Sequence, residues 1–136
     1  MVQKPGSPFD DLIVVCNGRL NDVLATAKVI RACDAWGKKK PRDRKRLDAM
    51  LKKFSDWGTG GFSKDRFAFE ERITVEHKSV AIFAFKPWQF RLYGIIRTVN
   101  LKTSFIATHA DPAKKQTKAH RGNLERAAVL SLPYLK

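Results

Sequence analysis

Three side chains in the second half of the chain, those of Arg91, Tyr93 and His109, suit phosphate binding and acid–base chemistry. Arg91 and Tyr93 stand two residues apart, so in a β-strand they point to the same face. A guanidinium binds phosphate oxygens through a fixed fork, imidazole titrates near neutral pH, and a tyrosine stacks on a base or donates a proton. The structural alternatives are an exposed strand arginine, a tyrosine packed at a sheet edge and a histidine that only supports the fold. A sheet face with Arg91 and Tyr93, beside paired lysines, suits a nucleic-acid backbone.

Further polar side chains around this strand are candidates for contact with the same backbone. A basic connector follows the Asp111-Pro112 turn, and its paired lysines lie beside the predicted mouth of the sheet. Residues 86–136 hold ten basic residues and only two acidic ones, which makes this half the denser cationic surface. The alternative is that the lysines are ordinary solvated charges. The candidate contact residues are Lys86, Gln89, Arg97, Lys114, Lys115 and Lys118.

The overall charge favours a polyanionic partner. The chain has 136 residues, of which 27 are basic and 13 acidic, so its formal net charge is +14. Hydrophobic residues make up 43% of it, which is normal for one globular domain spanning 1–136, with a loose lead-in over 1–10. Folding does not require such an excess of charge, and RNA, DNA or an acidic protein would attract it. No lipidation motif, spanning segment or signal peptide is found, so we expect a cytoplasmic protein without a membrane partner.

The cysteines and histidines do not form a metal-binding pattern. Cys16 and Cys33 lie in apolar stretches, where a thiol is most often a small buried hydrophobe. The histidines, at 77, 109 and 120, lack the helical spacing and the neighbouring cysteines of a zinc site. We therefore expect neither a metal nor another cofactor.

The segment from 79 to 109 predicts an antiparallel meander of three strands. Apolar residues fill Val80–Phe85, and a second strand over Trp88–Arg97 alternates between two faces. Trp88, Phe90, Leu92, Gly94 and Ile96 form its apolar face, and Gln89, Arg91, Tyr93 and Arg97 form the polar one, together with Ile95. A turn then leads into the third strand, Thr103–His109. The polar face of the second strand is the predicted site.

Before this meander the chain predicts a strand and two helices. A β-branched run at Leu12–Cys16 suits a strand, and an apolar stripe from Leu20 to Cys33 predicts a helix that Gly37 ends. The run at 38–46 has seven basic residues in nine, which we interpret either as a solvated inter-helix turn or as a phosphate contact. A second helix follows, with Pro41 in its first turn.

The second helix and the end of the chain complete the predicted order. Leu47, Met50, Leu51, Phe54 and Trp57 form an apolar stripe that we assign to the core. Residues 62–78 give the weakest pattern, although Ile73–Val75 suits another strand. A last helix begins with Asn123 as its cap and ends at Pro133. The predicted fold class is α+β: an N-terminal strand and two helices, then a three- to four-stranded antiparallel sheet and a C-terminal helix.

This order and the last third of the chain resemble the RelE/HigB superfamily of toxin–antitoxin toxins, including its phage-derived HigB-like branch. The resemblance rests on the segment QFRLYG at 89–94, on FIAT at 105–108, on KKQTK at 114–118 and on NLERAA at 123–128. It implies a RelE-like domain that cleaves messenger RNA on the ribosome without a metal and is silenced by a small antitoxin with a helix-turn-helix. In that pattern Arg91 matches the strand arginine, and Lys114 and Lys115 match the basic pair.

The resemblance gives the predicted residues their roles. Attack by a ribose 2′-hydroxyl needs proton removal, protonation of the leaving oxygen and stabilisation of an anionic phosphate. We expect Arg91, Tyr93 and His109 to be catalytic and the six flanking side chains to bind RNA. Two alternatives remain open: a non-catalytic toxin that acts on DNA gyrase, as the ParE relatives do, or a basic phage or mobile-element protein that only binds nucleic acid.

Overall fold

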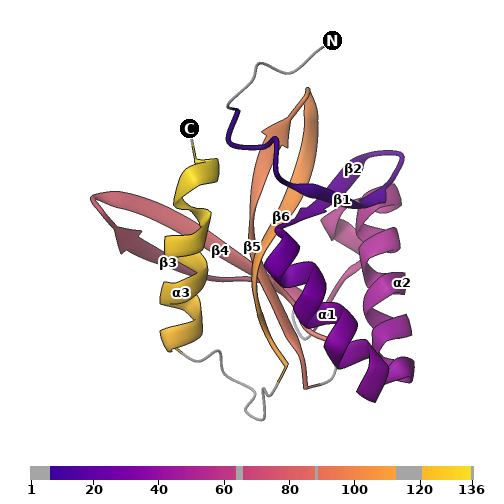
Figure 1. Ribbon diagram of the computed structural model, residues 1–136. Coiled ribbons are helices and arrows are strands. Elements are labelled where there is room, and N and C mark those ends of the chain that lie inside the picture. Colours follow the sequence, from indigo (N-terminus) through magenta and orange to yellow (C-terminus); the bar gives the residue numbers. More distant parts are fainter. Residues whose placement is uncertain (1–6, 64–65, 88, 113–120, 136) are drawn as a thin grey trace.

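A six-stranded mixed sheet lies between two layers of helices, which confirms the α+β class (Figure 1). This arrangement comes from a computed structural model that describes residues 7–63, 66–87, 89–112 and 121–135. The strands lie in the order β1-β2-β6-β5-β4-β3. The predicted sheet of three or four antiparallel strands was therefore too small, and one of its pairings is parallel.

The N-terminal part of the sheet is a hairpin rather than a single strand. β1 (Ile13–Asn17) pairs antiparallel with β2 (Asn21–Ala25), and β2 pairs parallel with β6 (Lys102–Asp111). The prediction that the helical stripe starts at Leu20 was wrong. β2 is covered on both faces. The short apolar run of a strand buried in this way cannot be distinguished from that of a buried helix by periodicity.

The two helices that follow cover one face of the sheet. α1 (Ala27–Lys39) begins after Thr26, whose hydroxyl accepts a hydrogen bond from the Val29 amide at 3.3 Å. It continues through Gly37, so the predicted end there was wrong. α2 (Pro41–Trp57) has the predicted first-turn proline and ends before Gly58, whose φ of 79° suits glycine. A short 3₁₀ turn, η1 (Thr59–Gly61), follows.

Two tight hairpins form the antiparallel half of the sheet. They join β3 (Phe67–Val75) to β4 (Lys78–Phe85), and β5 (Arg91–Val99) to β6. Both turns have two residues of positive φ, as right-handed strand twist favours. β4 and β5 pair through only three residues of each strand, and in Figure 1 the two hairpins diverge beyond that contact.

The sheet separates two apolar clusters. Phe90 and Leu92 join the cluster under α1 and α2, whereas Tyr93 and Ile95 join the one under α3 (Arg121–Ser131). The predicted alternation is therefore confirmed from Phe90 to Ile96, whereas Trp88 lies outside the described residues and β5 itself begins only at Arg91. α3 packs on the sheet through Leu124, Ala127 and Ala128, and the 3₁₀ turn η2 (Leu132–Tyr134) ends it.

Among the residues that the structure describes, no helix is both long and apolar enough to cross a bilayer.

Candidate functional site

A β-bulge in β6 turns His109 toward α3. Tyr93 of β5 pairs with His109, but the next residue, Gly94, pairs with Ala107, so Thr108 is the extra residue. The Thr108 hydroxyl lies 2.9 Å from the Ser131 hydroxyl and donates to the Ala127 carbonyl of α3 at 3.3 Å. Because the bulge breaks the strict alternation, both Thr108 and His109 contact α3. Bulges of this kind often re-aim a side chain next to a functional site.

His109 belongs to a hydrogen-bonded chain that ends on a carboxylate. Its Nε2 lies 2.8 Å from the Asn123 Oδ1, and the Asn123 Nδ2 donates to the Asp111 Oδ2 at 3.0 Å. A carboxylate accepts only, which fixes the amide with its oxygen toward the imidazole. His109 therefore donates through Nε2, and in its neutral form Nδ1 carries the free lone pair. The ring is half-buried, so it is oriented by the fold and still reached by solvent.

Tyr93 packs against His109 with its hydroxyl enclosed. The two rings are stacked, with centroids 5.9 Å apart and an interplanar angle of 17°. Tyr93 has no exposed surface, and its hydroxyl has no hydrogen-bond partner among the described residues. Burial raises the pKa of Tyr93 to about 12, with further raising contributions from Asp111 and Glu70. The phenol therefore stays protonated at neutral pH.

Arg91 lies at the first position of β5 beside an acidic neighbour. It is 8% exposed, it pairs across the sheet with Asp111, and its Nη1 donates to the Phe90 carbonyl at 3.0 Å. Near it, Lys86 forms a 2.9 Å ion pair with Glu70. The region thus combines cations with carboxylates, and Arg91 and Tyr93 are buried rather than open on the strand face that was predicted to be the site.

The structure brings some of the predicted contact residues together and separates others. Lys86 lies near the start of β5, and Gln89 is exposed in the turn that precedes it. Arg97 donates to the Leu135 carbonyl at 3.0 Å and lies six residues farther along β5, about 20 Å from Arg91 at strand spacing. The predicted contacts at Lys114, Lys115 and Lys118 fall outside the described residues.

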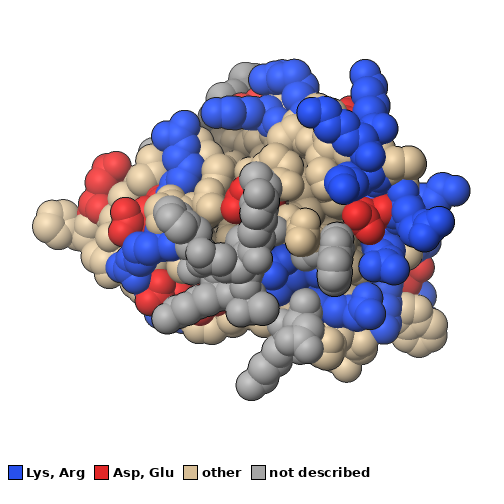
Figure 2. All heavy atoms as spheres, turned by 90° about the horizontal axis from the view of Figure 1, so that it is seen from below, with Lys and Arg blue, Asp and Glu red and all other residues tan. Residues whose placement is uncertain are grey.

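A second group of cations lies at the end of the molecule where β5 begins. Six exposed residues around the end of α1 and the start of α2 form what we call the basic corner. They are Lys38, Lys39, Lys40, Arg42, Lys45 and Arg46. Figure 2 shows Lys and Arg side chains gathered over the α1 and α2 half of this end, with acidic side chains interspersed toward β3 and β4. Arg44 is held within this run by Asp34 and Asp48, both at 3.1 Å.

Sequence patterns did not identify all of the polar residues at this site. Asn123 was predicted as a helix cap, but α3 begins at Arg121 and the Asn123 side chain joins His109 to Asp111. The spacing of His109 and Asp111, two residues apart on one strand, is the signal that could have placed both on one face. Glu70 gave no such signal, because it lies at a second bulge, in β3.

The described side chains do not indicate a metal site, and comparison with known proteins does not indicate a family. Within the described parts of the chain, no three His, Cys, Asp or Glu side chains are arranged to hold a metal ion. Comparison of the chain with protein-family models, curated proteins and solved structures gives no significant match.

Proposed function

We propose that this protein is an endoribonuclease that cleaves RNA by metal-independent attack of the 2′-hydroxyl, as expected of a RelE/HigB-like toxin. The observation that carries the proposal is the chain from His109 through Asn123 to Asp111, with Tyr93 stacked on the imidazole. A histidine oriented by a second polar group is a common arrangement for general acid–base catalysis. The formal charge of +14 supports a polyanionic substrate.

Each side chain has a role in this reaction. The Nδ1 of neutral His109 takes the proton of the 2′-hydroxyl, and the 2′-oxygen forms its bond to phosphorus. The bond from phosphorus to the 5′-oxygen breaks, and that oxygen takes a proton from the Tyr93 phenol, which is protonated at neutral pH. Arg91 stabilises the anionic phosphate. The products are a 2′,3′-cyclic phosphate and a 5′-hydroxyl. Since Arg91 and Tyr93 are buried, RNA must open the site on binding.

The order of elements along the chain also supports a RelE-like fold. A strand, two helices, three or four antiparallel strands and a helix were expected, and β1, α1, α2, β3, β4, β5, β6 and α3 follow that order. β2, which lies between β1 and β6 in the sheet, was not expected as a strand. In this proposal the protein acts in the cytoplasm on ribosome-bound messenger RNA and is silenced by a small antitoxin, which has a helix-turn-helix.

A second candidate function is RNA binding without cleavage. Two observations favour this second function: Arg91 and Tyr93 are buried, and Lys86 is paired with Glu70. Side chains held in this way support the fold rather than contact RNA. RNA would instead contact the basic corner, whose cations are exposed.

Primer extension on messenger RNA in a translating extract separates the two functions. We expect cuts with the wild type, and their loss in His109→Asn with the fold intact by circular dichroism. The matched control is His77→Asn, because His77 is exposed in the β3–β4 turn and its positive φ of 66° suits asparagine. Absence of cuts by the wild type, with RNA still bound, would establish the second function. Inhibition of DNA gyrase instead would indicate a ParE-like toxin.

A further inference from the structure

Trp57 is exposed, although its spacing assigns it to the apolar stripe of α2. Leu47, Met50, Leu51 and Phe54 of that stripe are buried, whereas Trp57 is 68% exposed. The helix buries Ser55 on its other side instead, where the Ser55 carbonyl accepts a 2.9 Å hydrogen bond from the Leu20 amide in the β1–β2 turn. Tryptophan is enriched at interfaces, because its large ring supplies contact area, so an exposed tryptophan with no core role is a candidate for ligand contact.

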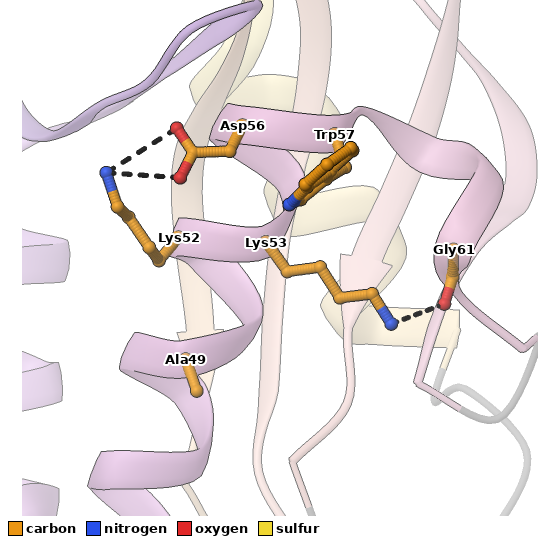
Figure 3. Close-up of a pocket in the computed structure, with 6 residues that line it drawn as sticks. All are labelled: Ala49, Lys52, Lys53, Asp56, Trp57 and Gly61. Atoms are coloured by element: carbon orange, nitrogen blue, oxygen red, sulfur yellow. Dashed lines mark hydrogen bonds and ion pairs between the residues drawn. The ribbon is translucent and has the colours of Figure 1, made fainter.

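An open hollow of about 700 Å³ lies beside the indole. Its lining comes from the last three turns of α2 and from η1: Ala49, Lys52, Lys53, Asp56, Trp57 and Gly61. Figure 3 shows the indole and the Lys53 stem side by side along this hollow, with the Lys53 ammonium directed at Gly61. The ring, the Ala49 methyl group and the lysine stems make the floor largely apolar, so a flat ring can lie on it.

Cations surround this apolar floor. The Arg19 guanidinium lies 5.4 Å from the centroid of the Trp57 ring. The Lys53 ammonium donates to the Gly61 carbonyl at 2.7 Å and is 5.1 Å from the centroid of the Phe62 ring. Asp56, the carboxylate among the described lining residues, accepts from the Arg19 amide at 3.1 Å and pairs with Lys52 at 3.2 Å. Its charge is therefore largely compensated within the site.

We propose that this hollow is a stacking platform for single-stranded RNA, in which a base lies on Trp57 and its phosphates contact Arg19 and Lys53. An aromatic ring flanked by cations is the arrangement by which proteins hold single strands without reading their sequence. A duplex, whose bases are already stacked on each other, cannot use the platform. The inference rests on the proposed function only in taking RNA as the ligand, since it does not require cleavage.

Binding of labelled oligouridylate of about 12 nucleotides, a length within the range of single-strand sites, tests the platform. The protein carries His109→Asn throughout, so that no RNA is cut. We expect Trp57→Leu to weaken binding about 5- to 150-fold, the equivalent of one base stacked on an aromatic ring, with no change in salt dependence. Lys53→Ala is expected to reduce the salt slope by about one counterion. The matched control is Phe69→Leu, which removes an exposed aromatic ring from β3 and is expected to bind normally.

Four results would overturn the platform. If Trp57→Leu bound the oligonucleotide as tightly as the parent protein, the platform would be refuted although RNA binding would stand. If Trp57→Leu lost as much affinity for duplex RNA as for the single strand, base stacking would not be the basis of the contact. Failure of the parent protein to bind RNA would remove the platform and the proposed function together. Polyglutamate that binds more tightly than RNA, and only when Trp57 is present, would identify an acidic protein segment as the occupant instead.

Discussion

Replacing Tyr93 with phenylalanine tests whether a buried hydroxyl, to which the described residues offer no hydrogen-bond partner, is kept for function. The substitution removes one oxygen and leaves the ring, so the stacking on His109 at 5.9 Å and the contacts under α3 persist. A buried hydroxyl without a partner destabilises the folded state by roughly 1–3 kcal/mol, and the small cavity left by its removal offsets part of the gain. We therefore expect Tyr93→Phe to raise the free energy of unfolding by about 0.5–2 kcal/mol near neutral pH.

The same substitution has a separate signature at alkaline pH. In the folded protein the pKa of Tyr93 is about 12, against 10.0 for an ordinary tyrosine. At a pH between these two values, the Tyr93 phenol is ionised in the unfolded chain but not in the folded one. The stability associated with the neutral phenol is therefore complete below pH 10 and is lost as pH rises toward 12. Two pKa units correspond to about 2.7 kcal/mol. Tyr93→Phe is expected to lack this loss, so the difference in free energy of unfolding between the variant and the wild type grows in that pH range.

Urea unfolding followed by circular dichroism, near pH 7 and between pH 9 and 11.5, measures both effects. Tyr134→Phe is the matched comparison near pH 7, because Tyr134 is also buried; its pKa is raised too, mainly by burial, so it does not serve as a control at alkaline pH. RNA cleavage by Tyr93→Phe should fall even though the protein is more stable, as expected for a residue retained for catalysis. A loss of more than about 1 kcal/mol near neutral pH would show that the hydroxyl has a stabilising partner, and would refute the reasoning.

Three further predictions concern the elements around the site. Gly94→Ala should lower the free energy of unfolding by about 3 kcal/mol in urea titrations, because a Cβ at Gly94 would overlap the Ile106 carbonyl oxygen in the neighbouring strand. Leu101→Gly should raise it by about 1 kcal/mol, since Leu101 is fully exposed and has a φ of 68° in a two-residue turn. Asn123→Ala should lower it by about 1–3 kcal/mol, and a double-mutant cycle with His109→Ala should give a coupling energy of at least about 0.5 kcal/mol. Additive effects in that cycle would contradict the hydrogen-bonded chain.

The sequence predicted those elements whose signals are local. α2 was identified by its proline, its apolar spacing and the glycine after it, all of which act within the helix itself. The alternation at 90–95 placed Phe90 and Leu92 on one face and Tyr93 on the other, because side-chain direction in a strand depends only on parity. The excess of basic residues likewise indicates an anionic partner in any fold.

Other features depend on contacts between distant segments. β2 is a strand because β6, about eighty residues later, pairs with it in parallel, and no local pattern distinguishes it from a helix. The site is decided in the same way. A one-residue bulge directs His109 to α3, and Asn123 meets it only because α3 packs on that face. Trp57 has core spacing but lies outside the core because the helix buries Ser55 against the β1–β2 turn. Periodicity specifies which side chains share a face, and only packing decides which face is covered.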